Sequence, residues 1–147
     1  MTTDTAKRRD AILQKLKEHQ HKLTPQRLAI VDILAGSEGH PNVETIYEEL
    51  RDDFPTMSLA TVYRNVMLVK SLGEVLELGF PDGSNRYDGR KPYPHPHVIC
   101  VKCKKIIDSN LSQMEDIAAT VASETGFQIL THRLDFFGLC ADCRFAG

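Results

Sequence analysis

The first half of the chain repeats apolar positions with the period of α-helices. Apolar residues recur at intervals of three and four, which places them on one helical face. They form four groups: Ala11, Ile12 and Leu16; Leu28, Val31 and Leu34; Val43, Ile46, Tyr47 and Leu50; and Leu59, Val62, Val66 and Val69. We therefore predict three or four helices before residue 73.

Capping residues mark where these helices begin and end. Thr24 before Pro25 predicts an N-cap with proline in the first turn, and Asn42 and Ser58 predict two further N-caps. Gly73 follows the last apolar group and predicts the end of the fourth helix.

Residues 74–88 change to the alternating pattern of strands. The run at 75–78 (Val-Leu-Glu-Leu) is followed by turn-forming residues at 81–84 (Pro-Asp-Gly-Ser), which predicts a β-hairpin. Helices followed by a hairpin are typical of a winged helix-turn-helix domain. We assign it to residues 1–88, with residues 58–72 as the recognition helix.

Residues 89–96 predict a stiff, extended hinge, because three of them are prolines at alternate positions. The residues that follow, 97–147, predict a small ββαβ domain, so that the fold class is α+β. Its predicted elements are strands at 97–101 and 105–108, a helix from a capping box (Ser112-Gln113-Met114-Glu115) to Gly126, and a strand at 127–137.

Four cysteines form two CxxC pairs in this second domain. They are Cys100 with Cys103, and Cys140 with Cys143. Two such pairs complete a tetrahedral Cys₄ shell, which selects Zn²⁺ and leaves no open position for catalysis. A pair of redox disulfides or an iron–sulfur cluster are the alternatives. We predict zinc, because a bound structural metal ion adds most to the folding stability of a domain this small.

Histidines and aspartates near the hinge form a second candidate set. His95 and His97 lie two apart on an extended segment and can share a metal ion. His40, Asp88 and Asp108 are weaker candidates, since each also suits a helix cap or a turn. One ion bound by all five would fix the orientation of one domain against the other.

Composition limits the class of protein. The chain has 147 residues, 41% hydrophobic and 26% charged, as in a globular protein. No apolar run approaches the roughly 18 residues of a membrane-spanning helix, and the first ten residues do not resemble a signal peptide. We therefore expect a cytoplasmic protein without a membrane partner.

The net charge of −2 hides a pattern along the chain. Residues 1–31 carry a charge of +4, residues 32–56 carry −6, and residues 57–72 carry +2. Two basic segments separated by an acidic one can still present a basic face to nucleic acid. The alternative is that these charges lie on ordinary solvated helix faces.

The predicted recognition helix offers contacts for double-stranded DNA. Ser58 and Thr61 suit phosphate, Arg64 can pair with guanine, and Tyr63 can pack on a thymine methyl group. Packing in the core is the alternative for Tyr63. The predicted phosphate contacts from outside this helix are Lys15, Lys17, Lys22 and Arg27.

Six motifs together resemble the ferric uptake regulator family, in register from about residue 20 to 143. The motifs are LTPQR (23–27), HPNVETIY (40–47), SLATVYRN (58–65), RYD (86–88), HPHVICVKC (95–103) and HRLDFFGLCADC (132–143). The resemblance implies a homodimeric, metal-dependent transcriptional repressor that binds operator DNA through a winged helix and dimerises through its C-terminal domain.

The resemblance also implies two metal sites in each chain. It implies that the four cysteines hold one structural Zn²⁺. It further implies one regulatory Fe²⁺ or Mn²⁺, held by His40, Asp88, His95, His97 and Asp108.

The residue at position 108 distinguishes branches of the family. Iron-sensing members usually carry glutamate there, whereas the peroxide-sensing branch carries aspartate, as here. The resemblance therefore implies that hydrogen peroxide is sensed through metal-catalysed oxidation of a ligand histidine, His40 or His95.

Three other readings of the sequence compete with peroxide sensing, and one of them is an interaction module that binds structural zinc and has no sensor site. An iron-responsive or other divalent-metal-responsive repressor is the alternative within the family, because Arg64 resembles the iron sensors. A mononuclear metalloenzyme is the alternative outside it, but the five ligands leave no obvious general base. We therefore expect no enzymatic activity.

Overall fold

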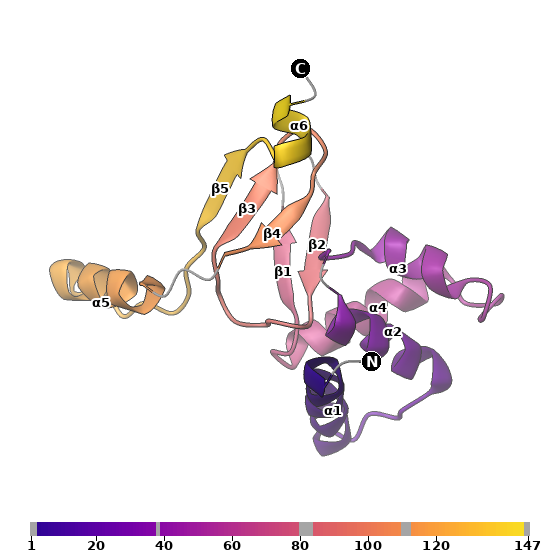
Figure 1. Ribbon diagram of the computed structural model, residues 1–147. Coiled ribbons are helices and arrows are strands. Elements are labelled where there is room, and N and C mark those ends of the chain that lie inside the picture. The colour runs from indigo at the N-terminus through magenta and orange to yellow at the C-terminus, as the bar shows by residue number, and fades with distance from the viewer. Residues whose placement is uncertain (1–2, 38, 80–83, 110–112, 146–147) are drawn as a thin grey trace. The chain divides into compact units, whose positions relative to one another are not determined.

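The computed structural model describes residues 3–37, 39–79, 84–109 and 113–145. The chain divides into two compact units, Met1–Pro92 and Tyr93–Gly147. The division lies inside the segment predicted as a hinge. Each unit is described separately below, and the elements of both are labelled in Figure 1.

The first unit contains four helices and a hairpin, in the order expected for a winged helix. The helices are α1 (Thr3–Glu18), α2 (Pro25–Gly36), α3 (Val43–Leu50) and α4 (Leu59–Ser71), and the strands are β1 (Leu76–Gly79) and β2 (Asn85–Asp88). The two strands pair antiparallel, with Leu76 opposite Asp88. Of the predicted turn, Pro81, Asp82 and Gly83 lie outside the described residues.

The predicted caps of the first unit are confirmed. The side chains of Thr24, Asn42 and Ser58 each accept a hydrogen bond from the backbone N–H three residues on, at the start of α2, α3 and α4. Gly73 has the left-handed φ of 78° that favours glycine after a helix.

The apolar groups read from the sequence form the core of this unit. Their members at the centre of the core are fully buried: Ile12, Leu16, Val31, Leu34, Ile46, Val62, Val66 and Val69. The chain approaches this core closely just after β2. A Cβ added at Gly89 would lie 2.7 Å from the carbonyl oxygen of Leu34 in α2, so only glycine fits there without a shift.

The second unit is built on a three-stranded sheet in the order β4-β3-β5. Its elements are β3 (His97–Cys100), β4 (Ile106–Asp108), α5 (Met114–Thr125), β5 (Asp135–Gly138) and α6 (Ala141–Phe145). The central strand β3 pairs antiparallel with β4 and parallel with β5, and α5 connects the two outer strands. The predicted ββαβ order is confirmed, with α6 added at its end.

The predicted strand at 127–137 is wrong over most of its length. Only residues from Asp135 onward are in a strand, paired with β3 from His97. Extending this ladder toward residue 127 would need residues before His97 as partners. Pro94 and Pro96 stand there and have no N–H to donate, so the pairing stops at His97.

The predicted start of α5 also differs. Ser112 lies outside the described residues, and the N-cap position is occupied by Gln113, whose side chain makes no capping hydrogen bond. The end is as predicted, because Gly126 has a left-handed φ of 75°. Among the described residues, no helix combines the length and apolar character needed to cross a membrane.

Candidate functional site

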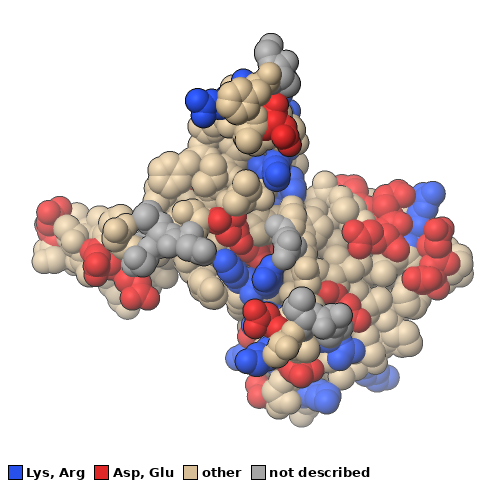
Figure 2. Space-filling view, in the orientation of Figure 1, with Lys and Arg blue, Asp and Glu red and all other residues tan. Residues whose placement is uncertain are grey.

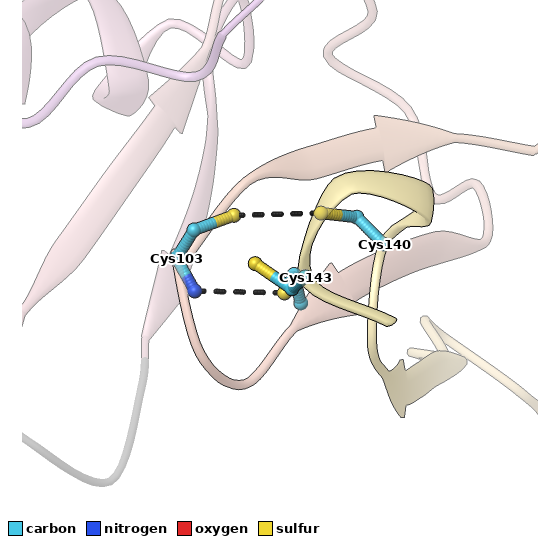
Figure 3. A group of neighbouring side chains, drawn as sticks. Cys103, Cys140 and Cys143 are labelled. Carbon is cyan, nitrogen blue, oxygen red and sulfur yellow. Dashed lines mark hydrogen bonds between the residues drawn. The ribbon is translucent and has the colours of Figure 1, made fainter. Parts of the chain in front are cut away.

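The four cysteines gather into one cluster in the second unit. Cys100 ends β3, Cys103 follows in the turn, and Cys140 and Cys143 lie at the start of α6 and within it. Their sulfur atoms all lie within 4.8 Å of one another. Figure 3 shows Cys103 and Cys140 directed toward each other. Their two sulfur atoms are 3.8 Å apart.

This spacing fits a tetrahedral metal ion. Zinc–sulfur bonds of about 2.3 Å in a tetrahedron place neighbouring sulfurs about 3.8 Å apart. A disulfide needs about 2.05 Å, and all four cysteines are free. The cluster therefore has the size of a single-ion Cys₄ site.

Backbone dipoles favour the thiolate form at one position of the cluster. The N–H groups of Cys103 and Cys140 lower the pKa of Cys100 to about 6, and the Cys103 N–H donates to its sulfur at 3.5 Å. The pKa of Cys143 is raised to about 12, first by its hydrogen bond with the Cys140 sulfur and then by burial. Four thiolates this close repel one another, so full deprotonation requires a bound cation.

His40 and Asp88 meet within the first unit. The Asp88 Oδ1 accepts hydrogen bonds of 2.9 Å from the backbone N–H groups of Arg90 and Lys91. Its Oδ2 lies 3.6 Å from the Nδ1 of His40. The backbone thus fixes one carboxylate oxygen of Asp88, while the other oxygen faces the Nδ1 atom of His40.

Arg86 holds the loop that carries His40. His40 has a φ of 51°, in the left-handed region that is costly for a residue with a side chain. The Arg86 guanidinium donates to the His40 carbonyl, and to the Gly39 carbonyl at 2.6 Å. The backbone N–H of Tyr87 donates to Pro41 at 3.0 Å. The strand β2 therefore positions both Asp88 and the loop opposite it.

His95, His97 and Asp108 meet within the second unit. The antiparallel register places His97 opposite Asp108, on β3 and β4. The Asp108 Oδ1 lies 3.2 Å from the Nε2 of His95 and 3.6 Å from the Nε2 of His97. Metal–ligand bonds of about 2 Å place neighbouring ligand atoms about 3–3.5 Å apart. The contact of 3.2 Å lies in this range and the contact of 3.6 Å lies just above it.

Three residues that contact the candidate metal ligands, or the backbone beside them, were not identified from the sequence as functional. Asp135 faces His97, Arg86 supports His40, and Arg8 donates to the Gly89 carbonyl at 2.9 Å, next to Asp88. The contacts join residues far apart in the chain, so spacing gave no signal for them. Arg86 and Asp135 lie on the strands β2 and β5 and Arg8 lies on the helix α1, so the three share no local sequence signal.

The structure gives the predicted DNA-contacting residues different surroundings. Ser58, Tyr63 and Arg64 are exposed on α4, and Tyr63 is 52% exposed, so it is not part of the core. Tyr63 instead lines an open hollow of about 620 Å³ beside the N-terminus of α3 and residues of β2. Thr61 is half-buried and hydrogen bonds with the Ser58 hydroxyl at 3.0 Å.

Some basic residues of α1 and α2 form hydrogen bonds or ion pairs with other residues of the first unit. Arg27 donates to the Asn65 side chain at 2.8 Å, and Arg8 and Arg9 pair with Glu74 and Asp32. Lys17 and Lys22 are exposed and Lys15 is half-buried. The basic character of residues 1–31 therefore rests mainly on the lysines.

The acidic segment between the basic ones lies on the surface of α3 and the turn after it. Figure 2 shows carboxylates gathered over α3. The exposed acidic residues there are Glu44, Glu48, Glu49, Asp52 and Asp53. The surface of α3 is therefore mainly acidic, whereas α1 carries basic and acidic residues together.

Known proteins resemble this chain over most of its length. The sequence model of the ferric uptake regulator family matches residues 17–137. The peroxide operon regulator of Bacillus subtilis is 40% identical over 131 residues, covering 89% of this chain and 90% of that protein. The peroxide-responsive repressor PerR of Staphylococcus saprophyticus is 38% identical over 132 residues, covering 90% and 88%.

A solved structure also resembles this one. The ferric uptake regulator Fur of Helicobacter pylori, described with three functional metal-binding sites, superimposes with a TM-score of 0.78. It is 25% identical in sequence, and the similarity covers 92% of this chain and 93% of that one.

We predict that Arg86→Ala destabilises the first unit by about 1–3 kcal/mol, because it leaves two carbonyls of a strained loop without their charged donor. Urea unfolding measures the loss, and hydrogen exchange of the backbone N–H groups of Gly39 and His40 should accelerate. Arg51→Ala is the control, because its ion pair with Glu48 is exposed and contributes about 0.5 kcal/mol or less. Equal losses in the two variants would contradict a supporting role for Arg86.

Proposed function

This chain belongs to the ferric uptake regulator family, and from that premise we propose that it is a metal-dependent repressor that releases operator DNA in response to hydrogen peroxide. Members of the family are transcriptional regulators rather than enzymes, so the metalloenzyme alternative is set aside. The names of the two relatives support the peroxide response. The observation that carries the proposal is the pair of imidazole–carboxylate sets, one in each unit.

We infer that both sets contribute ligands to one regulatory ion. His40 and Asp88 supply the ligands from the first unit, and His95, His97 and Asp108 supply those from the second. Neutral imidazoles and carboxylates are suitable donors for Fe²⁺ and Mn²⁺. The contact of 3.6 Å in the first set and the contacts of 3.2 and 3.6 Å in the second support the fit. An ion that needs ligands from both units favours one mutual orientation of the units, and DNA binding can depend on that orientation.

Oxidation of a ligand histidine then provides the response. Iron(II) bound at this site supplies the reducing equivalents that activate hydrogen peroxide. The net change adds one oxygen atom from the peroxide to the ring of His40 or His95 and releases water. The Tyr93 carbonyl holds the His95 ring at 2.7 Å, and the Arg86-supported loop holds His40. A modified ring no longer presents the same ligand atom, so the first unit loses its link to the second.

The helix α4 is the proposed reader of the operator. Ser58, Tyr63 and Arg64 are exposed at its N-terminal half, where side chains of a recognition helix reach base edges. Thr61, Lys15, Lys17, Lys22 and Arg27 are the further proposed contacts. A repressor of this kind acts on DNA in the cytoplasm.

The cysteine cluster is the proposed site of one structural Zn²⁺ per chain. Its sulfur spacing and its four free thiols support this assignment. The ion would connect the turn after β3 to α6 and leave no position for a substrate.

The outer face of the second sheet supports a homodimer. The register places Val98 between Ile107 on β4 and Phe136 on β5, and these three side chains are 40%, 50% and 48% exposed. Ile99 and Ile106 alternate with them and are buried on the opposite face. An exposed apolar row across three strands is costly in water and is removed when a second copy covers it.

The proposed function is tested on DNA selected by the Mn²⁺-loaded protein from a random-sequence pool. We expect Mn²⁺ and Fe²⁺ each to support binding, and peroxide to abolish binding by the Fe²⁺ form alone. Mass spectrometry should then find one added oxygen on His40 or His95. Peroxide-resistant binding by the Fe²⁺ form would instead favour the iron-responsive alternative.

The zinc assignment predicts that Cys143→Ser lowers zinc from one ion per chain to near zero. The second unit should unfold at the same time, because metal binding supplies much of the folding free energy of such small domains. Metal analysis and circular dichroism measure the two effects, with Ser123→Ala in exposed α5 as the control. A wild-type protein that contains disulfides and no zinc would contradict the assignment.

The homodimer predicts that Phe136→Lys halves the mass measured by light scattering. A buried lysine charge at the interface has no partner and is costly to desolvate. Leu59→Asp is the control. Leu59 is 41% exposed and lies in the other unit, so its substitution should leave the mass unchanged. A monomeric wild type at micromolar concentration would exclude this face as a stable interface.

A further inference from the structure

We propose that Asp135 is a positioning residue for His97, holding the imidazole with its proton on Nδ1 and its Nε2 lone pair directed toward the regulatory metal. This inference rests on the proposed function, which makes His97 a metal ligand. It adds a residue that lies outside the five proposed ligands.

The pairing of β3 with β5 creates the contact. His97 stands opposite Asp135 in the parallel register, and the His97 N–H donates to the Leu134 carbonyl at 3.1 Å. The Asp135 Oδ1 lies 3.7 Å from the His97 Nδ1, and a shift of a few tenths of an ångström brings the two atoms to hydrogen-bond distance. The sheet itself therefore presents the carboxylate to the ring.

His97 lies between two carboxylates, one at each ring nitrogen. Asp135 faces Nδ1 at 3.7 Å, and Asp108 faces Nε2 at 3.6 Å. A neutral imidazole has one N–H, so it can donate to only one of them. If the proton is on Nδ1, the Nε2 lone pair and the Asp108 carboxylate converge, which is the arrangement that a cation requires.

Asp135 is itself held in place. Its Oδ2 accepts a hydrogen bond of 2.6 Å from the Arg133 guanidinium, while its side chain is only 11% exposed. Its Oδ1 is buried, and no donor among the described residues lies within hydrogen-bond distance of that atom. Arg133 thus fixes one oxygen and leaves the other directed at the His97 ring.

His95 shows the same arrangement with a backbone acceptor. Its Nδ1 lies 2.7 Å from the Tyr93 carbonyl, and its Nε2 lies 3.2 Å from the Asp108 Oδ1. Both histidines therefore present Nε2 to the same carboxylate and have an acceptor at Nδ1. For His95 the acceptor is a main-chain atom close in sequence, whereas for His97 it is a side chain that can be replaced.

The test compares Asp135→Ala, Asp135→Asn and the control Glu124→Gln, which removes an exposed carboxylate from α5 of the same unit. Free Mn²⁺ measured by electron paramagnetic resonance gives the affinity of the regulatory site. We expect Asp135→Ala to weaken Mn²⁺ binding about 10- to 100-fold, Asp135→Asn to weaken it less, and Glu124→Gln to leave it unchanged. Zinc content and circular dichroism identify variants that fold.

The second readout is the tautomer of His97 in protein without the regulatory metal. Long-range ¹H–¹⁵N spectra should show the Nδ1–H form in the wild type and a loss of that preference in Asp135→Ala. A merely structural role for Asp135 would not change the tautomer. If Asp135→Ala does not fold, the wild-type and Asp135→Asn spectra decide the question.

Two results would overturn the inference: an Nε2–H tautomer in the wild type, or Mn²⁺ affinity within twofold of wild type in folded Asp135→Ala. His97→Ala separates this failure from that of the proposed function. If His97→Ala leaves Mn²⁺ affinity unchanged, His97 is not a ligand and the regulatory site is wrong. If His97→Ala abolishes binding and Asp135→Ala does not affect it, only the role of Asp135 fails.

Discussion

The backbone pairing of β3 with its two neighbours fixes the positions of both clusters of the second unit. This strand has four residues, with His97 at one end and Cys100 at the other. Pairing with β4 places Asp108 opposite His97, and pairing with β5 places Asp135 opposite His97 and Gly138 opposite Cys100. A slip of one residue would turn His97 to the other face and separate it from both carboxylates. The two ladders of hydrogen bonds made by β3 therefore set the imidazole cluster and the start of the thiol cluster together.

In both units, atoms that are not proposed metal ligands orient those that are. The backbone N–H groups of Arg90 and Lys91 fix one oxygen of Asp88, and Arg86 fixes the loop of His40. The Tyr93 carbonyl contacts the His95 ring. Such support lowers the conformational entropy that the coordinating side chains lose when a metal ion binds, because these side chains are already oriented. It also explains why a left-handed conformation at His40 is tolerated.

Local chemistry allowed much of the fold to be predicted. The N-cap Ser58 accepts a hydrogen bond from an N–H only three residues away. The spacing of Val62, Val66 and Val69 places the three side chains on one face of a single helix, and all three are buried. The prediction failed where the outcome depended on a distant partner. Residues 127–134 have no strand to pair with because prolines precede His97, and that fact concerns another part of the chain. The predicted exposure of Tyr63 is confirmed, but the sequence left core packing open as the alternative, because the position lies beside the apolar stripe and only the packing of α4 decides it.

The kinds of ligand atom and their grouping along the chain follow from the amino-acid sequence alone. Two CxxC pairs predict a Cys₄ site because two thiols on one turn are already close, and the family motifs identify the five proposed regulatory ligands. Which atom of each side chain faces its neighbour, and which residues support that side chain, depends on the folded arrangement of strands and helices. Asp135, Arg86 and Arg8 reach the candidate ligands or the backbone beside them only through strand register and helix packing. These contacts join residues far apart in the chain, and their geometry exists only once the backbone is folded.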